Sequence, residues 1–218
     1  MKTTLYALLF SSFSQAALVE FTGAPVRTLE VSGHKVPIYS EAVVRVGKSA
    51  SPRKLKLTGA GVREKKILVV SANVYVLTSY TDSDPKVFAK NPSTTIQEGQ
   101  TELLQMTLVR DLSADKIKDS FTDALEENQV PVDSKPIKAL FSQLVGDQKE
   151  GNVISIVSVK GEKGEETLTF DASGKPFSVS GPRLGADFWK IWFGKPADSG
   201  LEDLQKELTD PTFSRINS

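Results

Sequence analysis

The sequence predicts an α+β domain in which an antiparallel sheet is covered by helices on one face. The predicted elements are grouped along the chain, with strands first, then helices, then a three-strand meander, and helices at the end. Such grouping is typical of α+β folds, whereas regular alternation of strand and helix is typical of parallel sheets. The composition agrees, because 39% hydrophobic and 25% charged residues are an ordinary balance for a folded domain.

The N-terminal residues are typical of an export signal rather than of a folded element. Lys2 provides a positive start, an apolar run extends from Leu5 to Phe10, and small residues surround Ala16. This is the layout of a secretory signal peptide, and the run is far shorter than the roughly 20 residues of a membrane-spanning helix. The alternative is a buried first helix or strand. We therefore expect a cleaved signal over residues 1–17, a single domain over residues 18–218, no transmembrane segment, and a periplasmic or secreted protein.

Alternating and β-branched runs predict the strands. Ahead of and between the first helices, such runs cover residues 26–31, 36–39, 42–46, 55–59, 67–80 and 103–109. The run over 67–80 is interpreted as one long strand with a bend at residues 71–73. The later runs predict a meander with strands over residues 153–159, 167–170 and 177–179.

Capping residues and apolar spacing predict the helices. Apolar side chains at helical spacing predict one helix around residues 117–125, capped by Ser113, and a second around residues 137–145. A short aromatic helix is expected over residues 188–193. The pair Ser199 and Glu202 has the spacing of a capping box and predicts the start of the last helix.

Composition excludes several classes of function. Twenty-seven basic and 27 acidic residues give a net charge of zero, whereas binding of nucleic acid needs clustered Lys and Arg. The chain has no Cys and a single His, which excludes disulfides, thiol catalysis and metal sites built from several His. Phosphate-loop, dinucleotide and nucleophile-elbow motifs are all incomplete. We therefore expect no nucleic-acid partner, no metal and no cofactor, and a monomer, because no long exposed apolar stripe requires a partner.

Several polar and aromatic residues are interpreted as structural. His34 lies in a polar segment and is expected in a solvated turn. Glu165–Glu166 are expected in solvent, because neighbours on a strand point to opposite faces. Trp189 and Trp192 share a helix face and are expected in the core rather than in a ligand platform. Arg110–Asp111 are expected to form an ion pair at a helix start.

A series of motifs resembles the chalcone isomerase-like family, in particular its exported bacterial branch. The motifs are LKLTGAGVR at 55–63, NVYVLTSY at 73–80, VRDLSADK at 109–116, Phe121 and Asn128, and WFGKPAD at 192–198. The resemblance extends from about Val36 to Leu208 and implies an open-faced β-sandwich, a large antiparallel sheet wrapped by helices.

The resemblance implies two functions for Arg63, which occupies the arginine position of the G-x-G-V-R motif. In the plant enzymes this arginine stabilises the phenolate of a chalcone while the phenolate adds to its own unsaturated ketone. In non-catalytic members the arginine holds the carboxylate of a fatty acid, and a cleft between sheet and helices takes the acyl chain. A third interpretation is that Arg63 only forms a salt bridge with an acid at the sheet rim, such as Glu64 or Asp111.

The ketone side of the enzyme site is mostly not matched. Val70, with Ser71 beside it, stands at the threonine position, and the tyrosine position falls near Ser113. Lys116 matches a lysine of the same helix start, and Ser120 takes the asparagine position. Since Val70 cannot donate a hydrogen bond, this pattern favours ligand binding over cyclisation.

The resulting hypothesis is an exported protein that binds a small amphipathic carboxylate or phenolic ligand, fatty-acid-like, in a cleft between sheet and helices. Arg63 is expected at the head group, and the other candidate ligand-binding residues are Ser71, Tyr75, Ser113 and Lys116. The alternative is an intramolecular lyase of the chalcone-to-flavanone type with Arg63 as its catalytic residue. The third possibility is a structural or assembly protein whose cleft is filled by aromatic side chains such as Phe188 and Trp192.

Overall fold

The computed structural model describes residues 18–46, 51–67, 70–92, 100–161, 164–172, 174–210 and 212. The predicted signal peptide lies outside these ranges. Within the described residues, eight strands form one antiparallel sheet in the order β1-β4-β5-β6-β7-β8-β9-β10, and β2 and β3 form a separate hairpin. This arrangement confirms the predicted α+β class.

The element bounds follow the chain order. The strands are β1 (Val19–Phe21), β2 (Arg27–Val31), β3 (His34–Ile38), β4 (Glu41–Val44), β5 (Arg53–Ile67), β6 (Val70–Thr81), β7 (Glu102–Leu108), β8 (Val153–Lys160), β9 (Glu165–Ala172) and β10 (Lys175–Pro182). The helices are α1 (Pro85–Lys90), α3 (Ala114–Glu127), α4 (Lys135–Gln143), α5 (Leu184–Phe193) and α6 (Ser199–Leu208).

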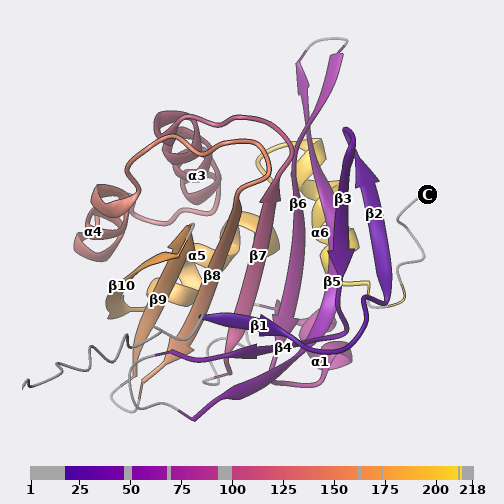
Figure 1. Cartoon of the computed structure of the whole chain (residues 1–218). Coiled ribbons are helices and arrows are strands. Elements are labelled where there is room, and N and C mark those ends of the chain that lie inside the picture. Colours follow the sequence, from indigo (N-terminus) through magenta and orange to yellow (C-terminus); the bar gives the residue numbers. More distant parts are fainter. Residues whose placement is uncertain are drawn as a thin grey trace, which may run out of the picture.

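The sheet buries apolar side chains on both faces, because successive residues of a strand point in opposite directions. On β7, Leu104 and Met106 join a cluster formed with α3, α5 and α6, whereas Leu103 joins a cluster formed with β1 to β4. Figure 1 shows α5 and α6 behind the sheet, and β1 and β4 crossing in front of it. The sheet is therefore enclosed by helices on one side and by its own curled edge and the β2–β3 hairpin on the other.

The predicted long strand over residues 67–80 is present as β6, but its predicted start is wrong. β5 continues to Ile67, and β6 begins at Val70, which pairs with Ile67 as the two strands form a hairpin. Residues 68–69, between the two strands, lie outside the described residues. The β-branched pattern continues across this connection, so the pattern alone does not mark the boundary.

Two irregularities in the β5–β6 pairing decide which side chains face the helices. The register shifts between Leu57 and Gly59 on β5, and again where Arg63 pairs with Tyr75 while Glu64 pairs with Asn73. The second shift places the extra residue, Val74, one position beyond the predicted bend. A β-bulge of this kind re-aims the side chains that follow it.

Helix α6 lies directly on the backbone of β5. A Cβ atom at Gly59 would lie 2.2 Å from the carbonyl oxygen of Glu207, and one at Gly61 would lie 2.1 Å from Glu207 Oε2. Glu207 Oε2 also accepts a hydrogen bond of 3.0 Å from the backbone N–H of Val62. The two glycines of the GAG motif thus serve helix packing.

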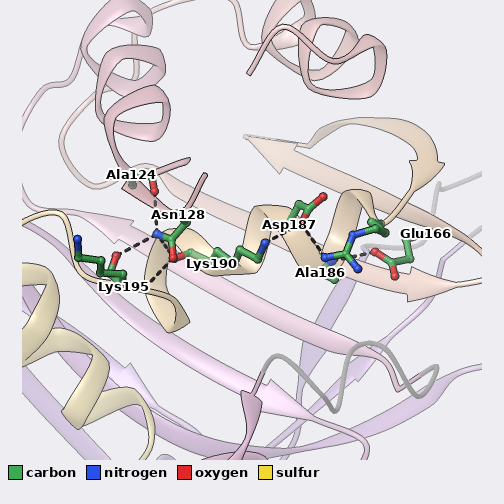
Figure 2. Close-up of polar contacts among 8 residues, drawn as sticks. Ala124, Asn128, Glu166, Ala186, Asp187, Lys190 and Lys195 are labelled. Carbon is green, nitrogen blue, oxygen red and sulfur yellow. Dashed lines mark hydrogen bonds and ion pairs between the residues drawn. The ribbon is translucent and has the colours of Figure 1, made fainter. Parts of the chain in front are cut away.

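Two other expectations change in the structure. Glu166 is buried, and its Oε2 accepts a 2.8 Å hydrogen bond from the backbone N–H of Ala186 in the first turn of α5 (Figure 2), whereas Glu165 is exposed as expected. His34 begins β3 rather than lying in a turn, and its Nε2 lies 2.7 Å from Glu150 Oε1. Both partners are distant in sequence, so local patterns did not indicate them.

Glu102 is a fully buried acid on the helix side of the sheet. Its Oε1 accepts a 2.9 Å hydrogen bond from the Thr81 hydroxyl, and its Oε2 has no hydrogen-bond partner within the described ranges. Burial raises the pKa of Glu102 well above its usual value, the negative charge of Asp82 adds to the rise, and the Thr81 hydrogen bond opposes it. The folded protein therefore binds a proton at this site more tightly than the unfolded chain does.

We expect Gly59→Ala to lower the free energy of unfolding by about 1–3 kcal/mol or more, because overpacking forces α6 away from β5. Urea unfolding followed by circular dichroism measures this change. Gly161→Ala is the matched control, since a Cβ there would meet only the Glu165 carbonyl oxygen, at 3.4 Å. Equal unfolding midpoints for Gly59→Ala and the control would contradict the packing role.

We expect Glu102→Gln to change the pH dependence of stability. The raised pKa of Glu102 provides stability that is fully present below the unfolded-state pKa of about 4.3 and is lost as pH rises through the folded-state pKa. The variant lacks this loss, so its stability relative to the natural protein should increase as pH rises from about 4.3 to the folded-state pKa and then stay constant. Urea unfolding at a series of pH values tests this, with Glu165→Gln as the exposed control. Parallel pH profiles for Glu102→Gln and the natural protein would refute the expectation.

Candidate functional site

A cavity of about 420 Å³ lies between the helix side of the sheet and helices α3, α5 and α6. Its walls come from β5, β6 and β7, from the segment that joins β7 to α3, and from the three helices. This volume falls in the range of small-molecule pockets, roughly 300–1,000 Å³. Apolar and charged side chains both line it, so the cavity suits a molecule with both characters.

Arg63 lines this cavity and is largely buried, with 8% of its surface exposed. Its Nη2 donates to Asp198 Oδ2 at 2.5 Å, and its Nη1 donates to the backbone carbonyl of Glu64. Helix α6 is tightly placed here, since a Cβ at Gly200 would lie 2.3 Å from Arg63 Nη1. The guanidinium is therefore held in one position by the start of α6.

Asp198 is both the ion partner of Arg63 and the N-cap of α6. Its Oδ1 accepts a 2.9 Å hydrogen bond from the backbone N–H of Leu201. Partial burial acts to raise the pKa of Asp198, but the hydrogen bonds from Arg63 and the Leu201 backbone outweigh it and lower this pKa. The predicted capping box is therefore wrong by one residue, because Asp198 rather than Ser199 caps the helix, and Glu202 pairs with Lys206 at 2.7 Å.

Tyr75 lies opposite Arg63 on the neighbouring strand and also lines the cavity. Its phenol oxygen accepts a 3.0 Å hydrogen bond from Trp192 Nε1. Burial raises the pKa of Tyr75, although the Trp192 hydrogen bond and the charge of Arg63 act in the opposite direction. Since the phenol oxygen accepts from Trp192, the phenol proton remains to be donated to another group. A guanidinium and a neutral phenol thus stand side by side in the wall of the cavity.

The structure brings together part of the sequence-predicted set. Arg63, Tyr75 and Lys116 line the cavity, with Lys116 exposed on α3. Ser71 is exposed near the start of β6 and is not part of the cavity wall. Ser113 caps α3 by accepting a 3.3 Å hydrogen bond from the Lys116 backbone N–H, as the helix prediction required.

Two further expectations concern the neighbourhood of the cavity. Asp111 pairs with Lys149 at 2.8 Å rather than with Arg110, so the predicted ion pair is wrong. Phe188 and Trp192 pack with Phe121 in the core, and the cavity beside them remains open. Their side chains therefore belong to the core, as expected for Trp192.

Asn128 positions the segment that carries Asp198, a role that sequence reasoning missed. Its Nδ2 donates to the Ala124 carbonyl at 2.8 Å and to the Lys195 carbonyl at 2.9 Å, while its Oδ1 accepts from the Lys195 N–H at 2.7 Å (Figure 2). A Cβ at Gly194 would lie 2.1 Å from Asn128 Oδ1. Asp198 ends the WFGKPAD motif just before a leucine-rich helix, and this position could have identified it as the helix cap from the sequence.

Comparisons with known proteins identify the family and the fold. A family model described as chalcone isomerase-like matches residues 40–207. The chain belongs to the chalcone isomerase-like family. The fold is also similar to the crystal structure of a fatty-acid binding protein of Arabidopsis thaliana, with a TM-score of 0.58 and 15% sequence identity over 87% of this chain and 98% of that chain. No curated protein matches the sequence.

The likeness to the plant protein concerns the fold of the chain. At 15% identity, the likeness to the plant protein shows the shared fold, and it confirms the large antiparallel sheet covered by helices. The assignment to an exported bacterial branch stays a prediction. Among the helices of the described part of the chain, none is long and apolar enough to cross a membrane.

Proposed function

We propose that this chalcone isomerase-like protein binds a small amphipathic carboxylate or phenolic ligand, fatty-acid-like, with its head group at Arg63 and its apolar part in the cavity. The observation that carries the proposal is a cavity whose wall presents a buried guanidinium beside a neutral phenol. The name of the structurally similar plant protein, a fatty-acid binding protein, supports the same class of ligand.

The apolar and polar groups of the cavity wall together favour an amphipathic carboxylate or phenolic ligand. Val74, Met106 and Ile191 are among the apolar residues of the wall, and each methylene buried against such a wall contributes roughly 0.8 kcal/mol. In the same wall, Arg63 supplies charge-assisted hydrogen bonds, and the Tyr75 hydroxyl is a further donor to a carboxylate or phenolate oxygen. An anionic ligand with one apolar chain or ring system complements both kinds of group in the wall.

The ion pair between Arg63 and Asp198 affects how strongly an anionic head group binds at Arg63. A guanidinium has five N–H donors, and Arg63 uses two nitrogens for Asp198 and the Glu64 carbonyl. An incoming head group therefore shares the guanidinium with Asp198, whose negative charge opposes it. Removing the charge of Asp198 should strengthen binding, and removing the charge of Arg63 should weaken it.

The rim of the cavity carries charges of both signs. No ion pair joins Lys65, Arg110 or Lys116 to an acid within the described ranges, and the acids Asp119 and Asp123 also line this rim. The exposed rim charges act in solvent, where each contributes little. The buried Arg63 is therefore the head-group residue in this proposal, and Lys116 assists from the rim.

The intramolecular lyase alternative has less support. Cyclisation of a chalcone requires hydrogen-bond donors near the ketone, and two predicted hydroxyls are placed elsewhere, with Ser71 exposed and Ser113 engaged in capping α3. Absorbance of a 2′-hydroxychalcone mixed with the purified protein tests this alternative directly. A cyclisation rate above background that is lost in Arg63→Gln would favour the lyase.

For binding, we expect Arg63→Gln to weaken dodecanoate by about tenfold to a hundredfold, because hydrogen bonds to charged groups contribute roughly 1.5–3 kcal/mol. Asp198→Asn should bind dodecanoate more tightly than the natural protein does. Asn caps a helix about as well as Asp, so this variant removes the charge and keeps the cap. Titration calorimetry and native mass spectrometry measure both effects.

The matched control is Asp203→Asn, which removes an exposed charge from the same helix and should leave affinity unchanged. Dodecanol is the ligand control, since its neutral head should bind Arg63→Gln and the natural protein equally. Circular dichroism establishes that each variant is folded. A folded Arg63→Gln that binds dodecanoate as well as the natural protein would overturn the head-group assignment.

We also propose that the protein is exported and is periplasmic or secreted. The support is the layout of residues 1–17, with a basic start, an apolar run and small residues at its end. Intact mass of the protein from its producing cells should correspond to a chain that starts near Ala17 or Leu18. A mass that includes residues 1–17 would contradict cleavage.

A further inference from the structure

A second, smaller chamber lies next to the main cavity. Its volume is about 60 Å³, and its walls come from β7, β8, β9 and β10, from α3, and from the end of α4 with the residues that follow it. Three side chains line both spaces: Met106, Ile117 and Phe121. The two spaces therefore share part of their walls and are adjacent at these three side chains.

Helix α3 lies over this boundary. Ile117 and Phe121 are four residues apart, so they share the face of α3 that is directed at the sheet, where Phe121 is buried. Lys116 and Ser120 line the main cavity alone, and Ala114 lines the second chamber alone. The two spaces thus lie on opposite flanks of α3, and their shared boundary lies beneath the helix.

The two spaces differ sharply in charge. Eight charged side chains are among the described residues that line the main cavity, namely Arg63, Lys65, Arg110, Asp111, Lys116, Asp119, Asp123 and Asp198. Among the described residues, no charged side chain lines the second chamber, whose wall includes Leu144, Ile156, Phe170 and Phe177. A chain that starts at Arg63 and moves under α3 therefore passes from a charged to a wholly uncharged environment. Apolar groups can be buried against the apolar part of either wall, but the second chamber presents no charged group that has to be kept hydrated.

We propose that the second chamber takes the far end of the ligand's chain, which passes beneath α3 between Met106, Ile117 and Phe121. This inference rests on the proposed function and names its ligand class: long, unbranched amphiphiles with one head group. Met106 is a flexible side chain and Ile117 is only partly buried, so both can yield to a thin polymethylene chain. A bulky or branched tail does not fit between them.

The test is an affinity series with octanoate, dodecanoate and hexadecanoate on the full-length mature protein. The natural protein should bind hexadecanoate more tightly than octanoate. Ala172→Leu adds bulk to the second chamber and leaves the main cavity unchanged, because Ala172 lines only the smaller space. It should keep the octanoate affinity within about twofold and weaken hexadecanoate by about tenfold, since each methylene that is no longer buried costs roughly fourfold.

The matched control is Ala139→Leu, the same substitution at an exposed position of α4 outside both chambers. It should leave the whole series unchanged. Equal affinity for hexadecanoate in Ala172→Leu and the control overturns the second-chamber assignment. If no fatty acid of any length binds the natural protein, the proposed function itself fails, and the two failures are therefore distinguishable.

A second measurement uses the natural protein and does not depend on the folding of a variant. Hexadecanoate with a photoreactive diazirine at its terminal carbon is bound, irradiated, and mapped by peptide mass spectrometry. We expect labels on Leu144 and Phe177, which line only the second chamber. Labels confined to Leu112 and Ile191, which line only the main cavity, overturn the proposal.

Discussion

The close contact of helix α6 with the backbone of β5 is the interaction on which the candidate site depends. Gly59 and Gly61 leave no side chain between strand and helix, so the helix reaches the β5 main chain. Its N-cap, Asp198, then meets the Arg63 guanidinium at 2.5 Å. The two glycines of β5 thus set the distance between strand and helix, and this distance brings Asp198 to Arg63.

The ion pair between the largely buried Arg63 and the more exposed Asp198 gives the site a defined electrostatic character. Removing the Arg63 charge from water is costly, and such a charge is retained where a partner and extra hydrogen bonds compensate. Arg63 has the Glu64 carbonyl and Asp198, and Asp198 has the Leu201 N–H. The Arg63 guanidinium therefore has hydrogen-bond partners without a ligand. In the proposed function the head group shares this guanidinium with them, which suits reversible uptake and release.

The helix positions also explain how an open space persists beside a dense aromatic core. Phe121, Phe188 and Trp192 pack edge to face with one another, and Asn128 fastens the end of α3 to the segment that follows α5. These contacts hold α3 above the sheet without filling the region toward Arg63. The cavity therefore persists because closely packed side chains next to it hold the surrounding elements in place.

Sequence patterns alone determined the α+β class, the three-strand meander, the cap of α3 and the resemblance that pointed to Arg63, because these depend on local spacing and on short motifs. Only the tertiary structure decided toward which face of the sheet each side chain of β5 and β6 points. The shift after Leu57 moves Gly59, Gly61 and Arg63 to the helix side, and alternation read from the sequence cannot show it. The partner of Arg63 lies 135 residues away, and Ser71, close to Tyr75 in sequence, ends outside the cavity. Register shifts and long-range ion pairs arise from how elements pack, and no local pattern records them.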